Sequence, residues 1–265
     1  MIVNKPSEER RRGFTLIEML VVVTIIGILA GLITAAALRA RTRAKIALIV
    51  LEVSELDAAC KMFKEKFGEY PPDGSDTAAT ARFILKAFPR KDPLKPGPPG
   101  IDPSTALVFW LGGYPTPPPD SLLNGFSADP ADPFNATAAA RILPFFDFGT
   151  FSRIAGDRTF RLIAKDPNNP LLFYYRPTKE GTPNIGYMYF RAQNRAYSGA
   201  GAMKDGRIAA QPWMNPDSFQ IRAGGWGQDV TIGPSQLFGV GTGYQTADWD
   251  DITNFSGGTL EDAIQ

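Results

Sequence analysis

The longest hydrophobic run of the chain lies near its start, over residues 14–38. It holds about 25 residues, and Glu18 is its only charged side chain. Because a helix rises about 1.5 Å per residue, the run exceeds a hydrocarbon core of about 30 Å. A carboxylate costs roughly 2.5–3.5 kcal/mol at a bilayer centre, so its retention suggests that it meets a positive partner. The pattern predicts a membrane-length helix with one functional charge.

A different pattern follows over residues 39–67. A basic collar, defined as Arg39, Arg41, Arg43 and Lys45, comes first. Apolar residues then recur at spacings of three and four, at Ile46, Ile49, Val53, Leu56, Cys60, Phe63 and Phe67. We expect Glu52, Glu55, Lys61, Lys64 and Glu65 on the other faces of this amphipathic helix. Gly68 and Pro71-Pro72 end the pattern. One helix from Phe14 to Phe67 is therefore predicted, and its second half needs a globular domain to cover it.

Residues 68–265 are predicted to form that domain. Most of the 26 glycines and 23 prolines lie here, which favours loops and short strands. A short helix is expected over 78–88, and 106–111 is expected to be a buried helix turn or strand within a proline-rich insertion at 89–135. Alternating segments predict strands at 158–163, 171–176, 185–190 and 218–223. The predicted fold class is α+β, a helical stem packed on an antiparallel sheet.

Composition removes several function classes. The chain has 28 basic and 27 acidic residues, so its charge gives no case for nucleic acid. It has no histidine, which removes Ser-His-Asp and Cys-His catalysis and nearly all catalytic zinc sites. The single cysteine, Cys60, cannot form an intrachain disulfide and is expected to be a buried apolar residue. A membrane-tethered enzyme or ligand-binding domain stays as an alternative, although no carboxylate pair argues for a glycosidase.

The residues Gly13-Phe14-Thr15-Leu16-Ile17-Glu18 resemble the processing site of type IV pilins and type II secretion pseudopilins. The resemblance implies that residues 1–13 are a leader, that prepilin peptidase cuts between Gly13 and Phe14, and that it methylates Phe14. It also implies that Glu18 pairs with the α-amine of a neighbouring subunit during filament assembly. An ordinary signal anchor or secretory peptide is the alternative, but it accounts for neither Gly13 nor Glu18.

The resemblance further implies a place and partners. Arg10, Arg11 and Arg12 precede the span, so the N-terminus is expected in the cytoplasm and the domain in the periplasm, with one pass through the bacterial inner membrane. The expected partners are further copies, other pseudopilins, prepilin peptidase and the inner-membrane secretion platform. The missing disulfide and the Asp-Asn-Phe pattern near the C-terminus favour a pseudopilin over a type IV pilin that serves adhesion, motility or DNA uptake. Members of the family commonly carry a proline deep in the apolar helix, which together with a glycine marks a stretch that loses its helical structure during assembly. This chain has Gly27 and Gly31 in the apolar run but no proline. The two glycines either allow such local unfolding or permit close contact between neighbouring helices.

An acidic loop over residues 239–258 completes the candidate sites. Its oxygen-bearing side chains are Asp248, Asp250, Asp251 and Asn254. The segment Asp250 to Phe255 resembles the C-terminal loop of major pseudopilins, which implies that these four residues bind calcium. Calcium takes six to eight oxygen ligands of these types. The alternative is a solvated acidic loop held by its aromatic residues.

Overall fold

The computed structural model describes residues 14–115, 123–148, 162–166, 171–175, 186–198, 201–224, 236–245 and 248–264. The chain divides into two compact units, Met1–Ala44 and Lys45–Gln265. Gly13 and parts of three predicted strands, at 158–161, 176 and 185, lie outside the described residues.

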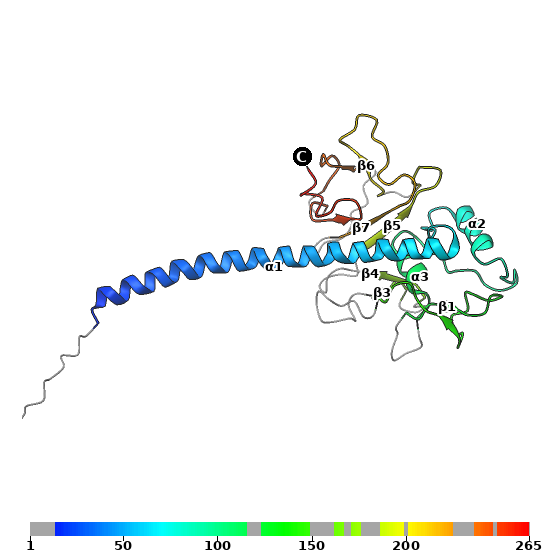
Figure 1. Cartoon of the computed structure of the whole chain (residues 1–265), viewed down its shortest axis with the longest axis horizontal. Helices are drawn as coiled ribbons and strands as arrows, with labels where there is room; N and C mark the ends of the chain where they lie inside the picture. The colour runs from blue at the N-terminus through cyan, green and yellow to red at the C-terminus, as the bar shows by residue number, and fades with distance from the viewer. Residues whose placement is uncertain are drawn as a thin grey trace, which may run out of the picture. The chain divides into compact units, whose positions relative to one another are not determined.

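Helix α1 (Leu16–Phe67) confirms the predicted long helix (Figure 1). It begins two residues later than predicted, because Thr15 is its cap. It ends where predicted: the Gly68 N–H donates to the Lys64 carbonyl over 2.7 Å, and Gly68 has a φ of 80° that favours glycine. In the second unit the predicted stripe is buried at Ile49, Val53, Leu56, Cys60 and Phe63, with Ile46 and Phe67 packed against the same core.

Glu52 was predicted on a polar face of α1, and this was wrong. Its side chain is 5% exposed and accepts a hydrogen bond from the Tyr175 hydroxyl and another from the Tyr187 hydroxyl, each 2.5 Å long. Glu52 precedes Val53 directly, so it borders the apolar stripe and faces the domain beside it. The two tyrosines supply donors for a carboxylate that burial would otherwise destabilise.

Two short helices belong to the second unit. Helix α2 (Thr77–Ala87) is the helix predicted over 78–88, and the Asp76 side chain caps it by accepting from the amides of Ala78 and Ala79. Helix α3 (Ala106–Gly112) shows that the apolar segment in the proline-rich insertion is helical, and every one of its residues is buried. Within α3, Trp110 packs edge-on against Phe63 of α1 and Phe83 of α2. The insertion therefore contributes to the core.

The strands are short and form several small sheets. Their bounds are β1 Phe126–Ser127, β2 Arg141–Ile142, β3 Leu162–Ala164, β4 Phe173–Tyr175, β5 Tyr187–Arg191, β6 Lys204–Asp205, β7 Phe219–Ala223, β8 Leu237–Phe238 and β9 Ile252–Thr253. The pairs β1–β2, β3–β4, β5–β7 and β7–β9 are antiparallel, and β6–β8 is parallel. Strands β5 and β7 lie side by side in Figure 1, with β9 on the far edge of β7.

The main core lies between the second half of α1, helix α3 and this three-stranded sheet. Tyr187, Tyr189, Phe219, Ile221 and Ile252 from the sheet share one buried cluster with the α1 stripe. The α+β fold, a long N-terminal helix packed against antiparallel strands in a globular domain, is thereby confirmed. Cys60 is free and buried, as predicted, and burial raises the pKa of its thiol well above the usual range.

Candidate functional site

The start of α1 is the first candidate site, and its geometry is local. The Thr15 amide and the Thr15 hydroxyl both donate to Glu18 Oε2, over 2.8 Å each. The Glu18 amide donates back to Thr15 Oγ1 over 3.3 Å. This reciprocal arrangement is a capping box, in which two residues three apart satisfy free amides at a helix start. Thr15 therefore fixes where the Glu18 carboxylate lies.

The carboxylate is placed beside an apolar surface. Phe14, Ile17, Val21 and Val22 line a shallow groove with Glu18. Phe14 is 74% exposed, so no described residue of the first unit covers it. The structure thus brings the predicted residues Phe14 and Glu18 together at one end of α1, whereas Gly13 lies outside the described residues. A second chain would find both an apolar surface and a negative charge here.

The first part of α1 meets the requirements for a membrane span. Among the described residues, α1 is the one helix long and apolar enough to cross a bilayer. None of its most hydrophobic window is buried against the rest of the protein. A core helix of a soluble protein passes the same test of length and composition, but its side chains are covered.

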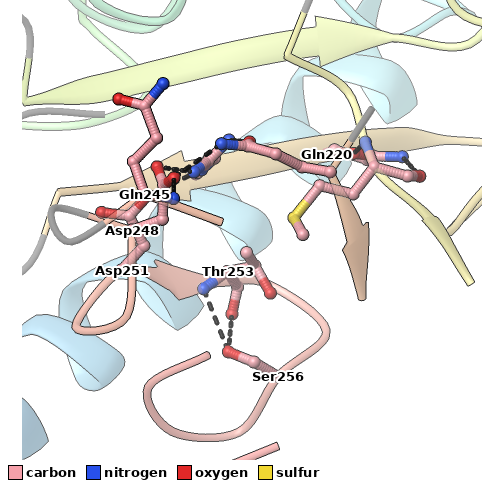
Figure 2. Close-up of polar contacts among 9 residues, drawn as sticks. Gln220, Gln245, Asp248, Asp251, Thr253 and Ser256 are labelled. Carbon is pink, nitrogen blue, oxygen red and sulfur yellow. Dashed lines mark hydrogen bonds and ion pairs between the residues drawn. The ribbon is translucent and has the colours of Figure 1, made fainter. Parts of the chain in front are cut away.

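The acidic C-terminal segment is the second candidate site, and an arginine lies at its centre. Arg222 of β7 is 1% exposed, and its Nε and Nη2 atoms lie 2.7 Å from carboxylate oxygens of Asp251 and Asp248. The Gln236 side chain accepts from Arg222 and donates to Asp248 over 2.7 Å. Figure 2 shows the labelled Asp248 and Asp251 among these dashed contacts, and the backbone amide of Gln245 also donates to Asp248 over 2.6 Å. We call these four residues, Arg222, Gln236, Asp248 and Asp251, the arginine cluster.

Burial in the arginine cluster raises the pKa of Asp251. Both carboxylates are fully buried, and among the described residues Arg222 is the one guanidinium paired with them. Burial raises the pKa of Asp251 to about 8, although Arg222 opposes the rise and Asp248 adds to it. The second oxygen, Asp251 Oδ1, is buried and makes no hydrogen bond with another described residue.

The predicted calcium ligands are used differently in this arrangement. Asp248 and Asp251 bind Arg222, while the Asn254 side chain accepts from the Ile221 amide and donates to Asp57. Within the described residues, no group of three or more Asp, Glu, Cys or His side chains is arranged to hold a metal ion. Asp248 and Asp251 are thus bound to a guanidinium, so a calcium ion would compete with Arg222 for these two carboxylates. Calcium binding stays a prediction.

Comparison with known proteins identifies the N-terminal segment. Residues 10–34 match the family model of the prokaryotic N-terminal methylation motif, the prepilin-type motif. No curated protein and no solved structure matched the chain. In general, the motif implies processing by prepilin peptidase and assembly into filaments of the pilin kind, whose subunits are typically structural and not enzymes. The matched residues include Phe14 and Glu18, which lie together at the start of α1.

Sequence reasoning missed Arg222 and the tyrosine partners of Glu52. All five residues of β7 are buried. Because side chains alternate between the two faces of a strand, one face carries Phe219, Ile221 and Ala223, and the other carries Gln220 and Arg222. A polar residue at alternate strand positions usually indicates a solvated face. The four predicted ligands Asp248, Asp250, Asp251 and Asn254 indicated a cation near the C-terminus, and nothing in the sequence indicated that Arg222 would supply a positive charge to Asp248 and Asp251.

Proposed function

We propose that this chain is a structural subunit of a type II secretion pseudopilus. It is made as a membrane precursor with residues 1–13 as its leader, is cut by prepilin peptidase between Gly13 and Phe14, and is methylated on Phe14. It then joins a periplasmic filament with further copies and other pseudopilins, on an inner-membrane secretion platform. The alternative within the same class is that the chain is a pilin, the subunit of a type IV pilus.

The observation that carries the proposal is the pairing of the methylation motif with helix α1. The motif covers residues 10–34, and the helix that starts inside it runs to Phe67. Within the first unit the apolar side chains of this helix are exposed, so they need lipid or another chain to cover them. Within the second unit the same helix is built into the core. The helix therefore serves as an anchor for the domain that it helps to fold.

Glu18 has a specific part in assembly. In the unassembled chain its carboxylate is bound by Thr15 alone among the described residues, with neutral donors. When apolar stems pack around it, a carboxylate without a cation becomes costly, and the α-amine of a neighbouring Phe14 relieves that cost. Only one axial offset between two stems brings the amine to the carboxylate. The pair therefore fixes register as well as adding stability.

The test uses the full chain in cells that carry its secretion or pilus machinery. The mass of the isolated chain should begin at N-methylated Phe14. Glu18→Ala should insert and be cleaved normally, yet yield about tenfold less filament or lower, because an unpaired buried charge costs a few kcal/mol and about 1.4 kcal/mol is a tenfold change. Glu65→Ala, at an exposed position of the same helix, is the matched control.

Two results would count against the proposal. A chain that keeps residues 1–13 would be a plain signal anchor, and normal filament yield from Glu18→Ala would remove the register role. Deleting the gene and comparing protein secretion with twitching motility separates pseudopilus from pilus. The absence of a disulfide supports the pseudopilin form, since the arginine cluster provides another means of fixing the C-terminal segment.

A further inference from the structure

The basic collar begins where the membrane-length run of α1 ends. Its three arginines, Arg39, Arg41 and Arg43, are all exposed, and no Asp or Glu occurs between Glu18 and Glu52. At about 100° per residue, Arg39 and Arg43 project from one side of the helix and Arg41 from nearly the opposite side. The positive charge therefore surrounds the helix. A partner that docks on a single face of the helix would need arginines on that face only.

The spacing places these arginines at the depth of lipid phosphates. Residues 19–38 are uncharged, and at about 1.5 Å per residue they span about 30 Å, the thickness of a hydrocarbon core. With Glu18 at one boundary, Arg39 lies at the other. The rise from Arg39 to Arg43 is about 6 Å, close to the 5–7 Å that one headgroup layer adds to a bilayer of about 40–45 Å.

The basic collar also opposes the orientation of the chain. Lys and Arg near a span favour the cytoplasmic side. Four basic residues precede the span, at Lys5, Arg10, Arg11 and Arg12, and the four of the collar follow it. The collar thus cancels much of the bias that would orient the precursor. After cleavage at Gly13, basic side chains remain at the exported end only. A feature that works against insertion needs another use.

We propose that Arg39, Arg41 and Arg43 bind the headgroup phosphates of anionic phospholipids in the outer leaflet of the membrane. The guanidinium group matches phosphate with two parallel hydrogen bonds and is weakly hydrated, so it suits this depth better than an ammonium group. Bound lipid holds the unassembled subunit at a fixed depth, with Glu18 at the inner boundary. The proposal rests on the membrane insertion in the proposed function, and it does not depend on filament assembly.

Lipid selectivity of the inserted chain tests the proposal. The mature full-length protein is reconstituted in phosphatidylcholine bilayers with a trace of spin-labelled phosphatidylglycerol or spin-labelled phosphatidylcholine, and the motionally restricted fraction of each is measured. We expect a several-fold preference for phosphatidylglycerol that falls as salt rises, since each arginine near the surface adds attraction. The R39Q/R41Q/R43Q variant should bind both lipids about equally.

A matched control separates the collar from overall charge. R82Q/R90Q/R195Q removes the same charge from exposed positions of the second unit and should keep the preference. Equal preference in wild type and the collar variant would overturn the proposal. So would a collar variant that keeps its lipid preference but loses crosslinking to a second copy, because the arginines would then serve that copy. Extraction of the wild-type chain from the bilayer by carbonate would instead refute membrane insertion, whereas lost filament assembly leaves the lipid preference measurable.

Discussion

Arg222 brings a positive charge to a position where its side chain is 2% exposed. Moving an ion out of water costs several kcal/mol, and this is repaid only when its partners are well placed. Here the partners are two carboxylates at 2.7 Å and the Gln236 side chain. Asp248 and Asp251 belong to the C-terminal segment and Arg222 to β7. The stability of that segment therefore depends on one residue.

Arg222→Met should destabilise the protein by about 3–5 kcal/mol, because it leaves buried carboxylates without their cation. Denaturant unfolding of the full chain in detergent micelles, followed by tryptophan fluorescence, measures this. Arg207→Met is the control: Arg207 pairs with Asp205 over 2.9 Å, but its side chain is 41% exposed, so a much smaller loss than in Arg222→Met is expected. Equal losses in the two variants would contradict the role given to Arg222.

Stability should fall as the pH rises from about 4 to about 8. Burial raises the pKa of Asp251 to about 8 in the folded state, against about 3.9 in the unfolded chain. Within that window the folded protein holds a proton that the unfolded chain has released, so raising the pH favours unfolding. The stabilisation that Asp251 contributes is therefore fully present below its unfolded pKa of about 3.9 and is lost as the pH approaches its folded pKa of about 8. Asp251→Asn should flatten this slope in urea midpoints at pH 5, 6.5 and 8, and an unchanged slope would locate the proton elsewhere.

Among the elements, α1 is the one that the sequence predicts best. Spacing alone identified its end at Phe67 and its buried stripe, because a 3.6-residue period and a glycine with positive φ are local properties. The position of Glu52 could not be predicted in this way. Its burial depends on Tyr175 and Tyr187, which are more than 100 residues away in the chain and come together only in the fold. Arg222 and Asp248 are closer, 26 residues apart, but they too come together only in the fold.

The contact between α1 and the strands can be tested at Tyr187. Tyr187→Phe removes a 2.5 Å hydrogen bond to the Glu52 carboxylate and should cost about 1.5–3 kcal/mol, the usual range for a bond to a charged group. Tyr174→Phe is the matched control, since Tyr174 is half-buried on the opposite face of β4 from Tyr175. It should change stability by less than about 0.5 kcal/mol. Thermal melting of the full chain compares them, and similar shifts would mean that Glu52 does not join helix and sheet.

For the whole molecule, the sequence predicted the fold class, which the structure confirms, but it did not predict how the C-terminal segment is fixed. For this segment we expected calcium at Asp248, Asp250, Asp251 and Asn254. The structure supplies Arg222, whose guanidinium contacts both Asp248 and Asp251. Both a calcium ion and an arginine side chain bind carboxylates, so the aspartates alone could not indicate which of the two cations they bind. The arrangement makes the two cations competitors, and this competition can be measured.

Calcium titration with thermal melting distinguishes the two cations. Millimolar calcium should leave the melting temperature of the wild-type full chain unchanged, because Arg222 already neutralises the site. In Arg222→Met the carboxylates are left without a cation, and calcium should restore stability. A site with a Kd near 10⁻⁴ M would regain about 2.7 kcal/mol at a hundredfold excess.

The control is the double variant Arg222→Met with Asp248→Asn, which has lost one carboxylate and should gain little from calcium. Magnesium serves as a second control, because it demands stricter octahedral geometry and gives up water reluctantly. A wild-type melting temperature that rises with calcium would show that the ion binds beside Arg222, as the C-terminal sequence predicts. A single variant that does not respond to calcium would mean that these carboxylates are positioned for a guanidinium only.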